Sequence, residues 1–237
     1  MLAIIKGTQG AGKTTTAKAL VQELGIKCLF TGITATASSQ FSSDTVNMLL
    51  KLGMNLDNFT VKEIFPAKKN AIIVNISDCR LIIIDEASML TQVKLARIEH
   101  HLRACFDDKP FGGLHTLQLM DAFQFPPVSK FLLKPSLYQG AVMMAKGMKV
   151  PHEAYAVGLN LFTKFNLNNL DEQKRASPAY DNFLSQLRKP FVDKPVTAQW
   201  LRGLPQLTVD DLENDERWFF APIAVTKNLE RHAINKI

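Results

Sequence analysis

The chain has 237 residues, of which 46% are apolar and 21% are charged, and its formal net charge is +6. This composition excludes an intrinsically disordered chain, and the length fits one large domain or two modest ones. The positive charge is scattered, with Lys68–Lys69 and Arg188–Lys189 among its basic pairs and no run of five or more, so it favours a polyanionic partner only slightly.

The chain is expected to alternate strands and helices. The expected strands are 2–6, 27–31, 81–84 and 115–120, and the helices between them are 13–24, which Gly25 closes, and 93–106. The uninterrupted apolar run at 81–84 is typical of a central parallel strand that is covered on both faces. This alternation predicts an α/β fold with a doubly wound parallel sheet.

After Pro127 the pattern changes. Residues 129–153 combine prolines, glycines and methionines without periodicity, which predicts an irregular connector, and order returns at 154–165. Ser177 and Pro178 are suited to begin a helix over 178–188. A strand is expected over 219–226, followed by a last helix that Asn228 caps. We therefore expect a first domain over residues 1–165 and the beginning of an incomplete second domain over 166–237.

Cysteine and histidine usage points to an intracellular protein without structural metal. The three cysteines, Cys28, Cys79 and Cys105, lie in apolar stretches without C-x-x-C spacing, which predicts buried, reduced thiols. His100 and His101 have no partner at metal-ligand spacing, so we expect them on the solvated surface and expect no zinc. No apolar stretch approaches the ~20 residues that cross a bilayer, so no membrane partner is expected.

Residues Gly7–Thr14 match the phosphate-loop pattern G-x-x-x-x-G-K-S/T at every fixed position. The glycines allow backbone amides to point at phosphate oxygens, and the following helix adds its positive amino-terminal dipole. Lys13 is expected to reach the β- and γ-phosphates, and the Thr14 hydroxyl to bind Mg²⁺. The predicted nucleotide-binding residues are Gly7, Thr8, Gln9, Gly10, Ala11, Gly12, Lys13, Thr14 and Thr15.

Two acids follow the apolar run at 81–84. Asp85 is expected to hold Mg²⁺, and Glu86 to orient and deprotonate the attacking water. Both would lie at the carboxyl edge of the sheet, where open α/β folds bind ligands. Together with the phosphate loop they define an ATP or GTP hydrolase or a phosphotransferase.

The stretch from Lys109 to Val128, KPFGGLHTLQLMDAFQFPPV, resembles the third motif of superfamily 1 helicases of the Pif (petite integration frequency) type, which are related to RecD. Residues 85–89 (DEASM) resemble the D-E-x-S-M box of that family, 34–38 (TATAS) its DNA-contacting segment, and 170–175 (LDEQKR) its fourth motif. The resemblance implies a RecA-like fold, with the start of a second RecA-like domain.

This resemblance also implies an activity. It is ATP-dependent DNA unwinding coupled to 5′-to-3′ translocation on single-stranded DNA, with ATP and Mg²⁺ as cofactors, in DNA repair, recombination or telomere maintenance. The resemblance assigns Gln124 to the γ-phosphate, Asp121 to fixing the Gln124 loop, and Arg175 to an arginine finger that reaches across a domain cleft. The residues that it assigns to DNA are Thr34, Thr36, Ser38, Thr45 and Asn47. Phe41 and Phe59 could stack on bases, although core positions are the commoner use of isolated aromatic residues.

Some positions depart from the family pattern. Met120 replaces a usual glycine, Asn47 a usual histidine, and Ala176 a usual glutamine. The chain begins six residues before the phosphate loop and ends before the last motifs of the family, so we expect it to be truncated at both ends. Truncation would leave weak binding to single-stranded DNA and no unwinding by this chain alone.

Two alternatives stay open: a phosphate-loop kinase or NTPase that acts on a small molecule, and a helicase relic that holds ATP or DNA without unwinding. A monomer is expected, with the nucleus as the favoured compartment.

Overall fold

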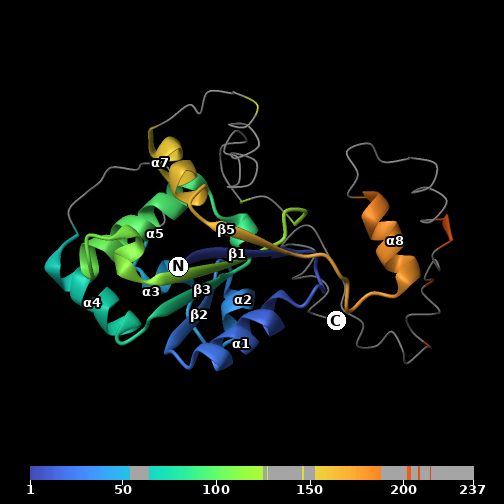
Figure 1. Cartoon of the computed structure of the whole chain (residues 1–237), viewed down its shortest axis with the longest axis horizontal. Coiled ribbons are helices and arrows are strands. Elements are labelled where there is room, and N and C mark those ends of the chain that lie inside the picture. Colours follow the sequence, from blue (N-terminus) through green and yellow to red (C-terminus); the bar gives the residue numbers. More distant parts are fainter. Residues whose placement is uncertain are drawn as a thin grey trace. The chain divides into compact units, whose positions relative to one another are not determined.

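Figure 1 shows the computed structural model of the chain, which describes residues 1–53, 64–124, 127, 146 and 153–187 and the single positions 202, 203, 208 and 214. Contacts divide the chain into two compact units, Met1–Asp181 and Asn182–Ile237, and the strands described belong to the first.

A parallel five-stranded sheet forms the centre of this unit, in the order β2-β3-β4-β1-β5. The strands are β1 (Leu2–Gly7), β2 (Cys28–Gly32), β3 (Leu81–Asp85), β4 (His115–Met120) and β5 (Asn166–Leu170). The first four confirm the strands expected from the sequence to within one residue at each end. Since all strands run the same way, the loops after β1, β3 and β4 meet at one edge of the sheet.

The described helices flank and connect these strands. They are α1 (Lys13–Leu24), α2 (Ala35–Ser39), α3 (Val46–Leu49), α4 (Pro66–Ile76), α5 (Gln92–Cys105), α7 (Glu153–Phe162) and α8 (Pro178–Leu187), with short 3-10 turns at Ala87–Met89 and Pro110–Gly113. Helix α1 ends as predicted, because Gly25 adopts φ 59° and its N–H donates to the Val21 carbonyl at 3.1 Å. Helix α8 begins at the end of the first unit and runs into the second.

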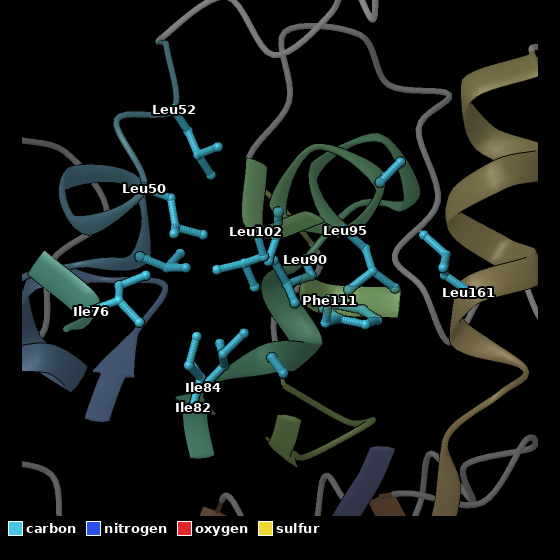
Figure 2. Packing of buried hydrophobic residues seen from close by; sticks show 14 of the residues in the cluster. Leu50, Leu52, Ile76, Ile82, Ile84, Leu90, Leu95, Leu102, Phe111 and Leu161 are labelled. Atoms are coloured by element: carbon cyan, nitrogen blue, oxygen red, sulfur yellow. The ribbon is translucent and has the colours of Figure 1, made fainter. Parts of the chain in front are cut away.

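Helices cover both faces of the sheet (Figure 1). On one face α3, α4, α5 and α7 bury a large apolar cluster, of which Figure 2 labels Leu50, Leu52, Ile76, Ile82, Ile84, Leu90, Leu95, Leu102, Phe111 and Leu161. On the other face α1 packs on a smaller cluster that includes Ala17, Ile83 and Leu119. Every residue of β3 is buried. Burial of a large aliphatic side chain contributes about 1.5–3 kcal/mol to stability. This strand therefore holds Asp85, its last residue, and Glu86 directly after it in place.

The boundary of the first unit lies later than residue 165, where the sequence placed it. Strand β5 pairs in parallel with β1, with Ala3 opposite Asn166 and Gly7 opposite Leu170. Residues 166–181 therefore extend the first unit instead of opening a second one. That residues beyond 181 begin a second RecA-like domain stays a prediction.

One sequence expectation about histidine is wrong. His101 is buried, with 5% of its surface exposed, and its Nδ1–H donates to the Leu50 carbonyl at 2.7 Å. Burial lowers the pKa of His101 to about 4, and the nearby Lys68, His100 and Arg97 lower it in the same direction. The spacing of apolar residues in α5 places His101 on the polar side of the helix. In the structure His101 is covered at the end of α3, where the Leu50 carbonyl lies. His100 is partly exposed.

The thiols follow the sequence expectation in part. Cys79 and Cys105 are buried, whereas Cys28 is half-buried, and all three are free. Burial raises the pKa of each. The predicted connector at 129–153, the strand at 219–226, the helix after Asn228 and Phe59 lie outside the described residues, apart from position 146 and the start of α7.

None of the helices described is long and apolar enough to cross a membrane. In the same part of the chain, no three His, Cys, Asp or Glu side chains are grouped so as to hold a metal ion. The expectation that the protein binds no zinc stays a prediction.

Candidate nucleotide site

The phosphate loop lies between β1 and α1 and is shaped by its glycines. Gly10 and Gly12 adopt φ values of 88° and 87°, in the left-handed region that favours glycine. The Ala11 N–H donates to the Thr8 carbonyl at 3.1 Å. The Lys13 ammonium donates to the carbonyls of Gly7 at 2.9 Å and Thr8 at 3.0 Å, so its charge is held at the loop where phosphate oxygens would bind.

Asp85 faces the start of α1 from the end of β3. Its exposed fraction is 9%, and burial raises the pKa of its carboxyl, while the Glu86 amide, the Lys13 charge and a hydrogen bond from the Thr14 side chain lower it. The Asp85 carboxylate and the Thr14 hydroxyl, the two predicted Mg²⁺ ligands, are therefore in contact. Oxygen ligands of this kind fit Mg²⁺, which binds proteins through one or two carboxylates together with waters and substrate phosphates.

Glu86 takes a backbone conformation that non-glycine residues rarely adopt, with φ 55° and ψ 35°. Its N–H donates to Oδ1 of Asp85 at 2.8 Å, and its Oε2 accepts a hydrogen bond from the Thr34 hydroxyl at 2.5 Å. Thr34 lies two residues after the end of the neighbouring strand β2, and the Ile33 N–H between them donates to the Asp85 carbonyl at 3.2 Å. The expected general base is thus held by a residue that the sequence had assigned to DNA.

Asp121 organises the loop after β4. It is buried, with 4% exposed, and its Oδ1 accepts from the Phe123 N–H at 3.0 Å while its carbonyl accepts from the Gln124 N–H at 3.2 Å. These bonds confirm the prediction that Asp121 fixes this loop. The Oε1 of Gln124 accepts from the Ser88 hydroxyl at 3.3 Å, which links the loop to the turn after Glu86. A cavity of about 210 Å³ opens beside it, lined by Lys6, Gly7, Thr8, Asp121, Ala122, Phe123, Asn169, Leu170 and Asp171.

Residues 173–175 lie directly against the phosphate loop. The Lys174 N–H donates to the Gly10 carbonyl at 3.1 Å, and the Gln173 amide donates to the Gln9 carbonyl. Gln173 in turn accepts from the Arg175 N–H at 2.9 Å. A Cβ added at Gly10 would lie 2.9 Å from the Cβ of Arg175. Arg175 is exposed and belongs to the same unit as the loop, so it does not reach the loop from a second unit as the sequence suggested. Its role as an arginine finger stays a prediction.

Some side chains that were predicted to contact DNA make hydrogen bonds inside the protein, and others are exposed. Ser38 is 1% exposed, and its hydroxyl accepts from the Gly32 N–H and donates to the Thr34 carbonyl, so this hydroxyl is engaged inside the protein. The contact of Ser38 with DNA stays a prediction. Thr45 caps α3 by accepting from the Met48 N–H at 3.4 Å. Asn47 is partly buried, and its Oδ1 has no hydrogen-bond partner among the described residues.

Thr36 is exposed. DNA contact by Thr34, Thr36, Thr45 and Asn47 stays a prediction. Phe41 is half-buried and stacks on Phe30, with ring centroids 4.8 Å apart, and its stacking on bases stays a prediction.

Sequence reasoning missed three contributors to the site. They are Ser88, which binds Gln124, Gln173, which bonds the phosphate loop, and Thr34 in its contact with Glu86. Ser88 lies within the DEASM box, so its position near the second acid was visible. The other two contacts join residues 164 and 52 positions apart, and no local pattern marks them.

A parallel sheet of order β2-β3-β4-β1-β5, with a phosphate loop after β1 and paired acids after β3, defines a RecA-like P-loop NTPase domain. The family described as PIF1-like helicase matches residues 2–194, and the chain belongs to this family.

Curated relatives and solved structures agree with this membership. The chain is 28% identical over 131 residues to the ATP-dependent DNA helicase Pif1 of Psychrobacter sp. (strain PRwf-1), which covers 52% of this chain and 19% of the relative. It is 27% identical over 135 residues to the ATP-dependent DNA helicase PIF7 of Trypanosoma brucei brucei. This alignment covers 53% of this chain and 13% of the relative.

The crystal structure of the Pif1 helicase from Bacteroides in complex with ADP-AlF3 and ssDNA matches 100% of this chain and 53% of its own, at a TM-score of 0.60 and 21% identity. That match shows the shared fold. The chain spans about a fifth or less of the curated relatives that it matches.

Proposed function

We propose that this chain carries the ATP-hydrolysing site of a DNA helicase that translocates on single-stranded DNA. The observation that carries the proposal is the convergence of Lys13, Asp85, Glu86 and Gln124 at one edge of the sheet, on loops that bond one another. Membership of the PIF1-like helicase family supports it, as do a relative named an ATP-dependent DNA helicase and a similar structure that contains ADP-AlF3 and ssDNA.

The roles follow from chemistry and position. The glycine-rich loop and the Lys13 ammonium would bind the β- and γ-phosphates, while Thr14 and Asp85 would hold Mg²⁺. When bound, Mg²⁺ neutralises charge that develops on the phosphate oxygens. Glu86 would orient the attacking water and accept its proton, and Gln124 would contact the γ-phosphate. Arg175, whose backbone is bonded to the loop through Gln173, would stabilise the departing phosphate.

Direction of movement and biological role rest on family resemblance. We propose 5′-to-3′ movement, and service to DNA repair, recombination or telomere maintenance in the nucleus by a monomer. A small-molecule kinase is disfavoured by the Asp121–Gln124 loop, whose family counterpart belongs to a helicase motif.

The test of the site is ATP hydrolysis by Lys13→Ala, with Lys27→Ala as its control. Lys27 carries the same charge, but it is largely exposed and pairs with Asp78 at 3.3 Å, away from the loop. We expect Lys13→Ala to lose turnover by at least about 100-fold, because a cation at the transferring phosphate is lost, and Lys27→Ala to retain it. Normal hydrolysis by Lys13→Ala would remove this loop from the catalytic site.

A further inference from the structure

The hydroxyl of Thr34 makes two hydrogen bonds at once. It donates to Oε2 of Glu86 at 2.5 Å and accepts from the Ala37 N–H at 3.2 Å. The second bond is that of a helix N-cap, because Thr34 immediately precedes α2 and its backbone is extended there. One side chain thus joins the start of α2 to the acid that is expected to act on water.

Helix α2 is fixed to the end of β2 by close packing. The Gly32 N–H donates to Oγ of Ser38 at 3.1 Å, and Ser38 and Ala37 are both buried. A Cβ added at Gly32 would lie 2.6 Å from the Cβ of Ala37, closer than real Cβ contacts allow. Since α2 and the strand end are packed this tightly, a displacement of α2 would carry the Thr34 hydroxyl with it.

The other end of the contact is anchored as well. The Glu86 backbone is held in its left-handed conformation by its own N–H bond to Asp85, so its side chain starts from a fixed point. A carboxylate that accepts a hydrogen bond from Thr34 has one oxygen engaged, and orienting a water at the γ-phosphate requires that this side chain be available.

We propose that Thr34 is a positioning residue that restrains Glu86 when DNA is absent, and that single-stranded DNA on the exposed side of α2, where Thr36 lies, releases it. This inference rests on the proposed function, in which Glu86 is the general base. It assigns to Thr34 the coupling between DNA binding and ATP turnover. The coupling acts on kcat, because Thr34 touches neither the phosphate loop nor the nucleotide-binding lysine through any described hydrogen bond.

The experiment measures kcat and KM for ATP without DNA in four variants. Thr34→Val removes the donor and the cap, and Thr34→Ser keeps both. Thr34→Gly removes the donor without adding charge beside Glu86, and glycine is well tolerated at a helix N-cap. Thr91→Val is the matched control, because Thr91 caps α5 by accepting from the Lys94 N–H at 3.2 Å.

We expect DNA-free kcat to rise about tenfold in Thr34→Val and Thr34→Gly, since a hydrogen bond to a charged acceptor is lost. The KM for ATP should be unchanged, and the ratio of DNA-saturated to DNA-free kcat should fall by the same factor. Thr34→Ser and Thr91→Val should keep the wild-type kcat. Thermal melting verifies that each variant folds, and Thr34→Gly carries the test if Thr34→Val does not.

One result would contradict the restraint by Thr34, and a different result would contradict the proposed function. A DNA-free kcat in Thr34→Gly that equals or falls below that of the wild type would overturn the restraint. Absence of ATP hydrolysis by the wild-type chain, with or without single-stranded DNA, would instead contradict the proposed function on which the restraint rests.

Discussion

At the scale of single residues, burial decides what the acids and histidines of this chain can do. Asp85 is almost fully buried, which raises the pKa of its carboxyl, and its counteracting partners are Lys13, Thr14 and the Glu86 amide. A carboxylate held in this way gains most from a cation that arrives with the nucleotide. This is the environment expected of a Mg²⁺ ligand and is hard to explain as a solvated strand end.

Burial of His101 predicts an acid sensitivity of the fold. The pKa of His101 is about 4 in the folded protein and 6.5 in the reference state. Between these two values the unfolded chain binds more protons than the folded one. The free energy of unfolding is therefore highest above pH 6.5 and decreases as the pH falls towards 4. Between pH 7.5 and pH 5 the loss should be about 2 kcal/mol. Urea unfolding at the two pH values measures it, and His101→Gln should reduce the difference. An equal pH dependence in wild type and His101→Gln would contradict this account.

At the scale of elements, α7 packs against the start of α5 at Gly158. A Cβ added at Gly158 would lie 1.9 Å from the backbone oxygen of Gln92, where no rotation of a side chain can relieve the clash. We therefore expect Gly158→Ala to lower the free energy of unfolding by at least about 2 kcal/mol. Val157→Ala, next to it and 41% exposed, should change it by less than about 0.5 kcal/mol. Chemical denaturation compares the two, and similar small effects would show that α7 can move away from α5.

The elements also show how far sequence patterns reach. Strand β3 was predictable, because its LIIID run is buried on both faces, and α1 was predictable from the phosphate loop before it and Gly25 after it. Strand β5 was not, because its sequence NLNNL is polar and four of its five residues are exposed at the sheet edge. Backbone pairing with β1 forms this strand, and pairing leaves no periodic apolar signal.

Some parts of the candidate site could be predicted from local sequence, and others could not. The phosphate loop and the acids at 85 and 86 occupy contiguous motifs, so their roles could be predicted from spacing alone. The bond between Thr34 and Glu86 depends on β2 and β3 being neighbours in register, with Gly32 opposite Asp85. Local sequence contains no information on that pairing. The burial of Ser38 likewise depends on how α2 packs at the end of β2.

At the scale of the whole molecule, the compact unit Met1–Asp181 contains Lys13, Asp85, Glu86, Gln124 and Arg175, the residues proposed to act on ATP. Because these five proposed residues all lie in one unit, we expect that unit to bind and hydrolyse ATP. Coupling to DNA then requires only that single-stranded DNA reach an element that is hydrogen-bonded to that site. Helix α2 is such an element, since Thr34 at its start bonds Glu86.

The most direct test of the central claim is the steady-state rate of ATP hydrolysis by the 237-residue chain as single-stranded DNA is added at low salt, with duplex DNA of the same length as the comparison. Low salt strengthens phosphate contacts, which weaken as counterions are added. The account predicts that kcat rises severalfold with single-stranded DNA and saturates, while the KM for ATP stays within about twofold. A measurable ATPase whose rate does not respond to saturating single-stranded DNA would contradict it, and would favour an NTPase that acts on a small molecule.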